Sequence, residues 1–290
     1  MLQRLDVARP GSVIGWAVVC GIAAGLVAAI YASIVGEPLV DQAIAIEEAT
    51  AEASASPSAG DDVGHPAEEE HGDDSIEVSR PTQSGPGLFL AYALFGGACG
   101  LLLAAGSLSL RGAWLDPFRR IAITGSILAG AITVVPWFKY PPNPPAVGDP
   151  TTAGERQRLF FLLVALTGVL LAGAAHLSAR LRRADWPGPR RGAAVAVAVV
   201  AVLGLLLAVM PPIDDAIPAA VGAELIWQFR VASLAGNLIL WSVLTVGFGL
   251  LCAESVRVRQ RARSGAAAPV GVGAGSGQNS MPFIAEIPSS

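Results

Sequence analysis

Residues 12–35 read SVIGWAVVCGIAAGLVAAIYASIV, a run of 24 residues that contains no acid and no base. About 20 helical residues are enough to cross the hydrocarbon core of a bilayer. In lipid, every backbone N–H and C=O group must be bonded within the segment, which favours a helix. The run is also longer than the roughly 7–15 apolar residues of a secretory signal peptide. We therefore expect a transmembrane helix here, and not a cleaved leader.

Five further runs share this character. They consist mainly of Leu, Ala, Val and Gly, and they contain no Asp, Glu, Lys or Arg. Together with the first run they predict an all-α integral membrane protein with six transmembrane helices, arranged as three in-out-in hairpins. The predicted spans are 12–35, 87–109, 121–138, 159–179, 193–210 and 231–253.

The composition excludes several other classes of protein. Of the 290 residues, 53% are hydrophobic and 14% are charged, whereas a soluble domain carries about 25% charged residues. The net charge of −4 leaves no basic face for a nucleic acid. No GxxxxGK[ST] motif is present, so we expect no intrinsic nucleotide site. Because Ser107, Ser126 and His176 do not have the spacing of a nucleophile with its base, we expect neither an enzyme nor a bound cofactor.

Arginine and lysine in the connections predict the orientation in the membrane. Alternate connecting segments carry 14 basic residues on one side and five on the other. Cytoplasmic loops hold the excess of Arg and Lys, so both termini should be cytoplasmic in a multi-pass protein of a bacterial plasma membrane. This orientation divides the chain into a cytoplasmic N-terminus with the first span (1–35), an outer loop (36–86), the other five spans (87–253) and a disordered cytoplasmic tail (254–290).

The outer loop 36–86 is strongly acidic. It holds 13 of the 23 acids, among Ala, Ser, Pro and Gly, and shows no apolar period, so most of it should be disordered. Imidazole and carboxylate groups together suit borderline divalent ions, and a flexible strip lets them converge on one ion. An alternative is that the strip is only a solvated linker. The candidate metal ligands at its centre are His65, Glu68, Glu69, Glu70 and His71.

The three outer connections begin with proline-rich segments, the first of them at Gly36-Glu37-Pro38. Proline should stop each helix and stiffen the residues after it. Each connection also carries acids close to its helix, namely Glu37, Asp149 and Asp214. Three hairpins of one orientation would present these carboxylates around a single outer mouth, where they would attract cations.

Two ionisable residues lie within or beside the spans. His176 is near the cytoplasmic end of the fourth span, and the favoured interpretation is a structural hydrogen bond to a neighbouring helix. Arg230 precedes the sixth span, seven residues before Asn237 and thus on the same helix face. A fixed cation would repel a transported cation, so we expect Arg230 to be a structural ion-pair partner of an outer carboxylate such as Glu224.

Four segments, taken in order, resemble CbtA, a family of predicted cobalt transporter subunits. The resemblance covers nearly the whole chain except the centre of the first loop and the tail after Arg263. The segments are Glu37-Pro38, VSRPTQSGPG (78–87), KYPPNPPAVGDP (139–150) and LIWQFRVASL (225–234). The residues that match the family pattern are Glu37, Lys139, Tyr140, Pro141, Asn143, Pro144, Asp149, Trp227, Phe229, Arg230 and Ser233.

The resemblance implies an integral membrane protein that takes up cobalt for corrin cofactor synthesis. It also implies a partner, a small single-span protein with a histidine-rich end. We assign structural or gating roles to Lys139, Tyr140, Asn143 and Trp227 on this basis. The leading hypothesis is a permease-like protein that collects Co²⁺ on the acidic outer loop and passes it through the helix bundle. The alternative is a noncatalytic membrane scaffold or accessory protein whose acidic loop is a solvated spacer.

Overall fold

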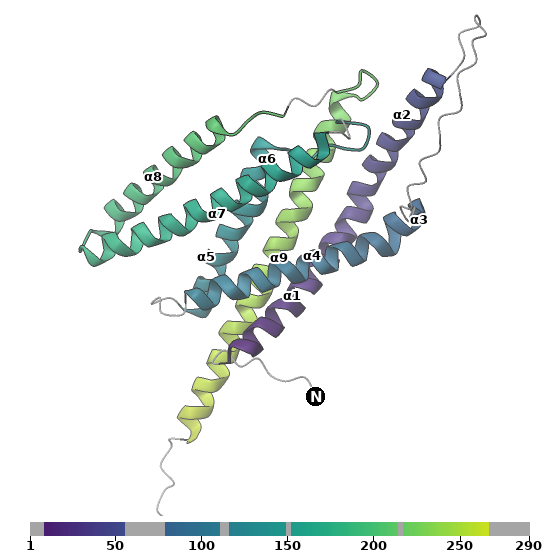
Figure 1. Ribbon diagram of the computed structural model, residues 1–290. Coiled ribbons are helices and arrows are strands. Elements are labelled where there is room, and N and C mark those ends of the chain that lie inside the picture. Colours follow the sequence, from purple (N-terminus) through teal and green to yellow (C-terminus); the bar gives the residue numbers. More distant parts are fainter. Residues whose placement is uncertain (1–8, 56–78, 111–115, 149–151, 214–216, 267–290) are drawn as a thin grey trace, which may run out of the picture.

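The computed structural model describes residues 9–55, 79–110, 116–148, 152–213 and 217–266. These parts of the chain are helical with short connections, and they contain no strand (Figure 1). The prediction of six helices long and apolar enough to cross a membrane is confirmed. They are Pro10–Ala53, Arg80–Ser109, Pro117–Lys139, Ala153–Arg183, Gly188–Val209 and Ala223–Ser264.

The first span does not end at Gly36-Glu37-Pro38, and that prediction is wrong. Helix α1 (Pro10–Tyr31) continues through a π-helical turn, η1 (Ala32–Gly36), into α2 (Glu37–Ala55). Proline has no N–H to donate, and its ring crowds the carbonyl one turn earlier. A wider π turn directly before Pro38 relieves both problems, so the helix runs on. The first part of the predicted disordered loop 36–86 is therefore helical, while residues 56–78 lie outside the described residues.

Two other spans contain the same combination of a π turn and a proline. Helix α3 (Arg80–Thr82) leads through η2 (Gln83–Gly87) into α4 (Leu88–Ser109); η2 contains Pro86 and is kinked at Gly85, whose φ of −102° and ψ of −110° are not helical. Likewise, α5 (Pro117–Ala129) leads through η3 (Gly130–Val134) into α6 (Val135–Lys139), where Pro136 is in the first turn. Local π adjustments of this kind let transmembrane helices contain proline.

Helices α1 and α4 make the closest contact in the fold, through small residues. Ala17, Gly21 and Gly25 lie along α1 at intervals of four and meet Gly96 and Gly100 of α4. A Cβ atom built on Gly21 would lie 2.1 Å from the carbonyl oxygen of Gly96. The two backbones therefore touch with no side chain between them, as in GxxxG pairs of membrane helices.

The last helix, α9 (Ala223–Ala266), completes the bundle by packing against both α1 and α5. Its buried side chains Leu240, Leu244 and Phe248 belong to the same core as Ala17 and Leu103. Helix α9 continues past residue 253, so residues 254–266, predicted to belong to a disordered tail, are helical.

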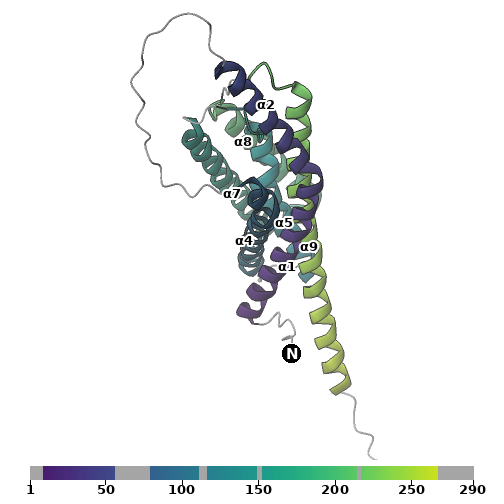
Figure 2. The same cartoon turned by 90° about the vertical axis from the view of Figure 1, so that its right-hand side faces the viewer.

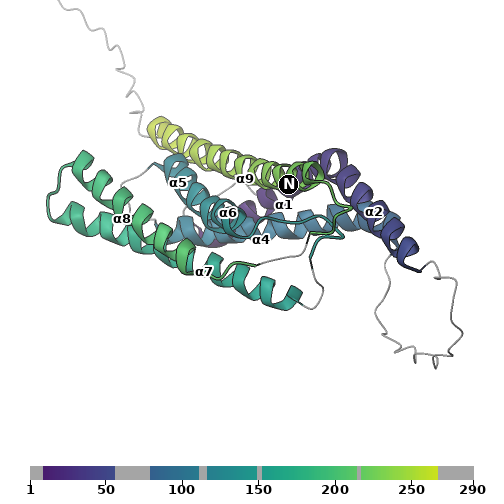
Figure 3. The same cartoon turned by 90° about the horizontal axis from the view of Figure 1, so that it is seen from above.

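Helices α7 (Ala153–Arg183) and α8 (Gly188–Val209) form a hairpin at the side of the bundle (Figures 1 and 3). Helix α8 packs chiefly against α7 and has no buried residue. Val200 and Leu205, for example, are 70% and 64% exposed. Apolar side chains with this exposure suit a helix whose outer face contacts lipid.

Helix α1 begins and α9 ends at the same end of the bundle (Figures 1 and 2). We call the opposite end, where α6 ends and α9 begins, the outer end, after the orientation predicted from the basic residues. Helix α2 extends along the outer end and packs there through Ala43 in a second small core with Val147, Val221, Leu225 and Ile226. The proline-rich loop after α6 is thereby fixed against α2 and α9.

Candidate functional site

A cavity of about 1400 Å³ lies toward the outer end, and it is lined by α4, η3, α6, α7 and α9 together with the loop that follows α6. The top view in Figure 3 shows α6 and its loop lying between α7 and α9. Seven of the residues that match the family pattern in the sequence line this cavity: Lys139, Tyr140, Pro141, Asn143, Pro144, Arg230 and Ser233. We call it the outer cavity. It brings together residues that lie about 90 positions apart in the chain.

Arg230 connects the loop after α6 to α9. Its Nη2 donates a hydrogen bond to Oδ1 of Asn143 at 2.7 Å, and its backbone carbonyl accepts one from Nε1 of Trp137 at 2.9 Å. The predicted ion pair with Glu224 is not formed, and the Glu224 carboxylate instead accepts a hydrogen bond from Gln228, one turn along the helix. Among the described residues, the guanidinium of Arg230 therefore bonds an amide and not an acid, and its backbone carbonyl bonds an indole.

Tyr140 joins the second hairpin to the third. Its hydroxyl donates a hydrogen bond of 2.9 Å to the carbonyl oxygen of Pro211, just after α8. Partial burial raises the pKa of the Tyr140 phenol above its ordinary value. The loop after α6 is therefore held on one side by α9 and on the other by the end of α8.

The turn at the end of this loop depends on Gly148. Its φ of +110° lies in a region that residues with a side chain rarely adopt. A Cβ atom built on Gly148 would also lie 2.2 Å from Nη1 of Arg156. The guanidinium of Arg156 therefore packs directly on the glycine backbone. This contact places a cation from the first turn of α7 at the wall of the outer cavity.

Three cationic side chains line the outer cavity. Lys139, Arg156 and Arg230 all line it, whereas no Asp or Glu is among the described lining residues. Nε of Arg230 is buried and has no hydrogen-bond partner within the described parts of the chain. A buried donor without a partner is costly, which marks this guanidinium as a group with unused binding capacity.

Glu37, a predicted metal ligand, lies instead in an ion-pair cluster that we call the outer clasp: Arg80, Glu37 and Asp41. Nη2 of Arg80 contacts the carboxylate of Glu37 and also Oδ1 of Asp41, the latter at 2.7 Å. The Glu37 side chain is 16% exposed. The outer clasp therefore joins the start of α2 to the start of the second span and occupies the Glu37 carboxylate.

The other predicted metal ligands lie outside the described residues. They are His65, Glu68, Glu69, Glu70, His71, Asp149 and Asp214. Where the structure does describe the chain, no three His, Cys, Asp or Glu side chains are grouped closely enough to hold a metal ion.

Two predicted residues lie apart from the outer cavity. Trp227 is 58% exposed at the start of α9 and does not line it. His176 is exposed on α7, and no hydrogen bond joins it to another described residue. The hydrogen bond to a neighbouring helix that the sequence suggested for His176 is thus not formed within the described chain.

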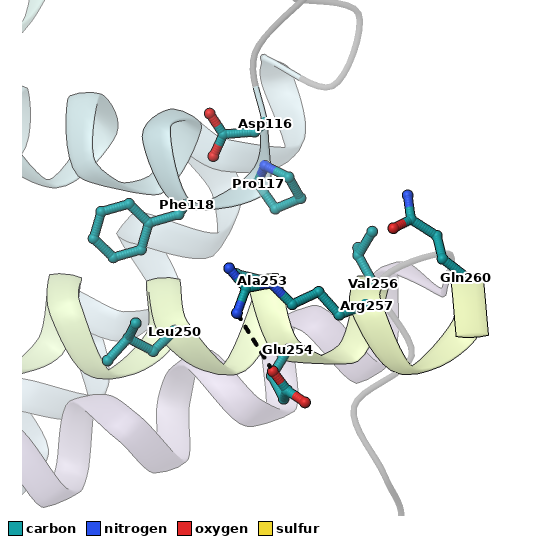
Figure 4. A pocket seen from close by; sticks show the side chains of 9 residues that line it. All are labelled: Asp116, Pro117, Phe118, Leu250, Ala253, Glu254, Val256, Arg257 and Gln260. Atoms are coloured by element: carbon teal, nitrogen blue, oxygen red, sulfur yellow. Dashed lines mark ion pairs between the residues drawn. The ribbon is translucent and has the colours of Figure 1, made fainter. Parts of the chain in front are cut away.

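A second hollow of about 710 Å³ lies at the opposite end of the bundle, between α5 and α9 (Figure 4). Asp116 at its edge accepts a hydrogen bond from the backbone N–H of Arg119 and so caps α5. Nη1 of Arg257 lies 3.9 Å from Oε2 of Glu254, and Figure 4 draws this ion pair as a dashed line. Both carboxylates therefore already have partners, and the residues that resemble the CbtA pattern do not line this hollow.

Sequence reasoning did not single out several polar residues of the outer cavity. Tyr92, Arg156 and Gln157 line it, and Trp137 positions Arg230. Tyr92 belongs to a uniformly apolar run, so no local pattern distinguishes it. Arg156 and Gln157 precede a span, where polar residues commonly mark the membrane interface.

Comparison with known protein families gives a match over most of the chain. Residues 11–253 match the model of a family described as "Probable cobalt transporter subunit (CbtA)". The match covers all six apolar helices up to residue 253 and the segments that build the outer cavity. No curated protein and no solved structure is significantly similar to the chain.

Proposed function

The chain belongs to the CbtA family, and from this membership we propose that it is the multi-pass membrane component of a cobalt uptake system in a bacterial plasma membrane. The observation that carries the proposal is the family match over 11–253, which reaches every helix that is long and apolar enough to cross the membrane. Transport by a protein of this kind requires no covalent chemistry from the chain. The word "subunit" in the family description also implies a partner.

In this proposal, metal is collected on the acidic loop and not on Glu37. The outer clasp occupies the Glu37 carboxylate with Arg80, so this group would have to lose an ion pair before it could bind a metal ion. His65 and His71, with the acids between them, provide imidazole and carboxylate together, a combination that suits cobalt. In the sequence, this strip lies between Asp41 and Arg80, so both of its ends lead to the outer clasp.

The proposed orientation places the acidic loop outside the cell and both termini in the cytoplasm. The excess of basic residues in the predicted cytoplasmic connections supports it. The placement of the start of α1 and the end of α9 at one end of the bundle agrees with an even number of crossings (Figure 1). A small single-span protein with a histidine-rich end is the proposed partner, and it would share the task of capturing the ion.

Cobalt accumulation in cells tests the proposal and the role of the loop together. Cells that express the chain with its partner should accumulate cobalt faster than cells with an empty vector. We expect His65→Ala/His71→Ala to raise the half-saturating cobalt concentration by about tenfold or more, since two ligands of the capture site are lost. The rate at saturating cobalt should change little, because capture and not passage is impaired.

The matched control is His176→Ala, which removes the third histidine of the chain from an exposed position on α7. Accumulation by this variant should equal that of the wild type. If the double histidine variant behaves like the wild type at low cobalt, the loop is only a solvated spacer. If the wild type gives no more cobalt than the empty vector, the transport proposal fails.

A further inference from the structure

The described lining of the outer cavity carries charge of the wrong sign for a bare divalent cation. Lys139, Arg156 and Arg230 line it, and the described lining includes no carboxylate. Pores that pass cations are lined by acids or carbonyl groups, whereas Arg and Lys line those that pass anions. Like charges repel strongly where little water screens them, so a dication would be excluded from the neighbourhood of these three groups.

The same residues form a favourable set of donors for oxygen anions. Guanidinium groups bind carboxylate and phosphate oxygens through paired hydrogen bonds, and the ammonium of Lys139 adds a further charge. Nε of Arg230 is buried without a hydrogen-bond partner among the described residues, although Nη2 of the same group is bound to Asn143. Tyr92, Gln157 and Asn237 add neutral polar groups to the lining.

The remainder of the wall is apolar and aromatic. Phe95, Phe160, Phe161 and Val164 line the cavity together with the polar loop. A volume of about 1400 Å³ is larger than a single inorganic ion requires. The size and lining together suit an anionic group attached to a larger body.

We propose that the outer cavity binds an oxyanion, a carboxylate or phosphate group carried by an organic ligand, through Arg230 and Lys139. Two sources share this chemistry: a soluble carboxylate, including an anionic chelate of cobalt, and the phosphate of an anionic lipid. The anion site stands on the cavity alone. Only the statement that cobalt would arrive there as an anionic complex rests on the proposed function.

Binding to the purified full-length protein in phosphatidylcholine nanodiscs tests the proposal, with citrate as the soluble probe. Calorimetric titration should show saturable binding of citrate, with and without an equal amount of Co²⁺, that weakens as salt is raised. Lys139→Gln and Arg230→Gln should each weaken it about tenfold or more, because each removes a charged hydrogen-bond donor. Arg261→Gln, the same change at an exposed position on α9, should leave binding unchanged.

Two further experiments are needed. One identifies whether the bound anion comes from a lipid or from solution, and the other tests whether the cavity is instead a cation site built on acids. If phosphatidylglycerol in the nanodisc abolishes citrate binding and is retained by the wild type more than by Lys139→Gln, a lipid headgroup is the occupant. If phosphatidylglycerol has no effect, the occupant is soluble. Asp149→Asn/Asp214→Asn should not weaken citrate binding, because removal of negative charge cannot weaken an oxyanion site.

The proposal is overturned if neither citrate nor phosphatidylglycerol binds to folded wild-type protein. It is also overturned if Co²⁺ alone binds, is lost in Asp149→Asn/Asp214→Asn, and binds more tightly in Lys139→Gln. Because the assay measures binding and not uptake, a protein that binds citrate but moves no cobalt would refute the transport proposal and leave the anion site standing.

Discussion

Gly21→Leu is expected to remove nearly all folded protein from the membrane. A Cβ atom at Gly21 would lie 2.1 Å from the carbonyl oxygen of Gly96, and the rest of a leucine side chain has no space between the two backbones. Helices α1 and α4 would have to separate along their whole contact, which includes Gly25 and Gly100. Overpacking a close contact costs about 3 kcal/mol in severe cases, and here the obstacle is backbone that cannot rotate away.

The measurement is the amount of monodisperse protein after detergent extraction, together with its thermal unfolding midpoint. Gly15→Leu is the matched control, because Gly15 is exposed on the same helix and no atom lies within 4 Å of a Cβ built there. This control should behave like the wild type. Equal yield and equal melting of Gly21→Leu and Gly15→Leu would show that α1 and α4 do not pack in this way.

Arg80→Glu is expected to destabilise the outer end and to stop transport. The substitution removes the cation shared by Glu37 and Asp41 and places a third carboxylate beside them. Loss of a charged hydrogen bond costs about 1.5–3 kcal/mol, and the Glu37 carboxylate, only 16% exposed, would be left without its partner. The thermal unfolding midpoint and cobalt accumulation should both fall. Arg158→Glu, an exposed position near the outer end, should change the midpoint little.

The double variant Glu37→Arg/Arg80→Glu distinguishes a structural role of Glu37 from metal binding. If the outer clasp is structural, the exchanged charges should restore much of the unfolding midpoint and of cobalt accumulation. A double variant that folds well but accumulates no cobalt would show that the Glu37 carboxylate has two roles: it pairs with Arg80 and it also binds the metal ion. Failure of the exchange to recover the midpoint would mean that the pair contributes little to stability.

The number and approximate position of the spans follow from the sequence because long apolar runs admit only a helix in lipid. The ends of the helices follow less well. The sequence predicts a helix end at Pro38, yet the π turn Ala32–Gly36 accommodates the proline and α2 continues to Ala55. A π turn has no sequence signature of its own, so a proline within an apolar run cannot by itself distinguish a helix end from a widened turn.

The outer cavity is predictable in part. Lys139, Tyr140, Asn143 and Arg230 stand out through their resemblance to the family pattern, and the structure places them in the lining of one cavity. Their partners are not predictable, because the bonds Arg230–Asn143 and Tyr140–Pro211 join residues 87 and 71 positions apart. Charge reasoning favours Glu224 for Arg230, but Glu224 bonds Gln228 on its own helix. Arg156 also lines the cavity, where its guanidinium packs on Gly148, a contact that the sequence does not reveal.

A role in cobalt uptake is best tested through the cobalt content of cells that lack only this chain, measured at low external cobalt in its own host, where every partner is present. We expect the content to fall several-fold and to be restored by the wild type but not by Gly21→Leu. Nickel and zinc contents, measured in the same cells, show whether the effect is specific to cobalt. An unchanged cobalt content in the deleted cells, with the chain verified as present and folded in the parent, would contradict the assignment of this protein to cobalt uptake.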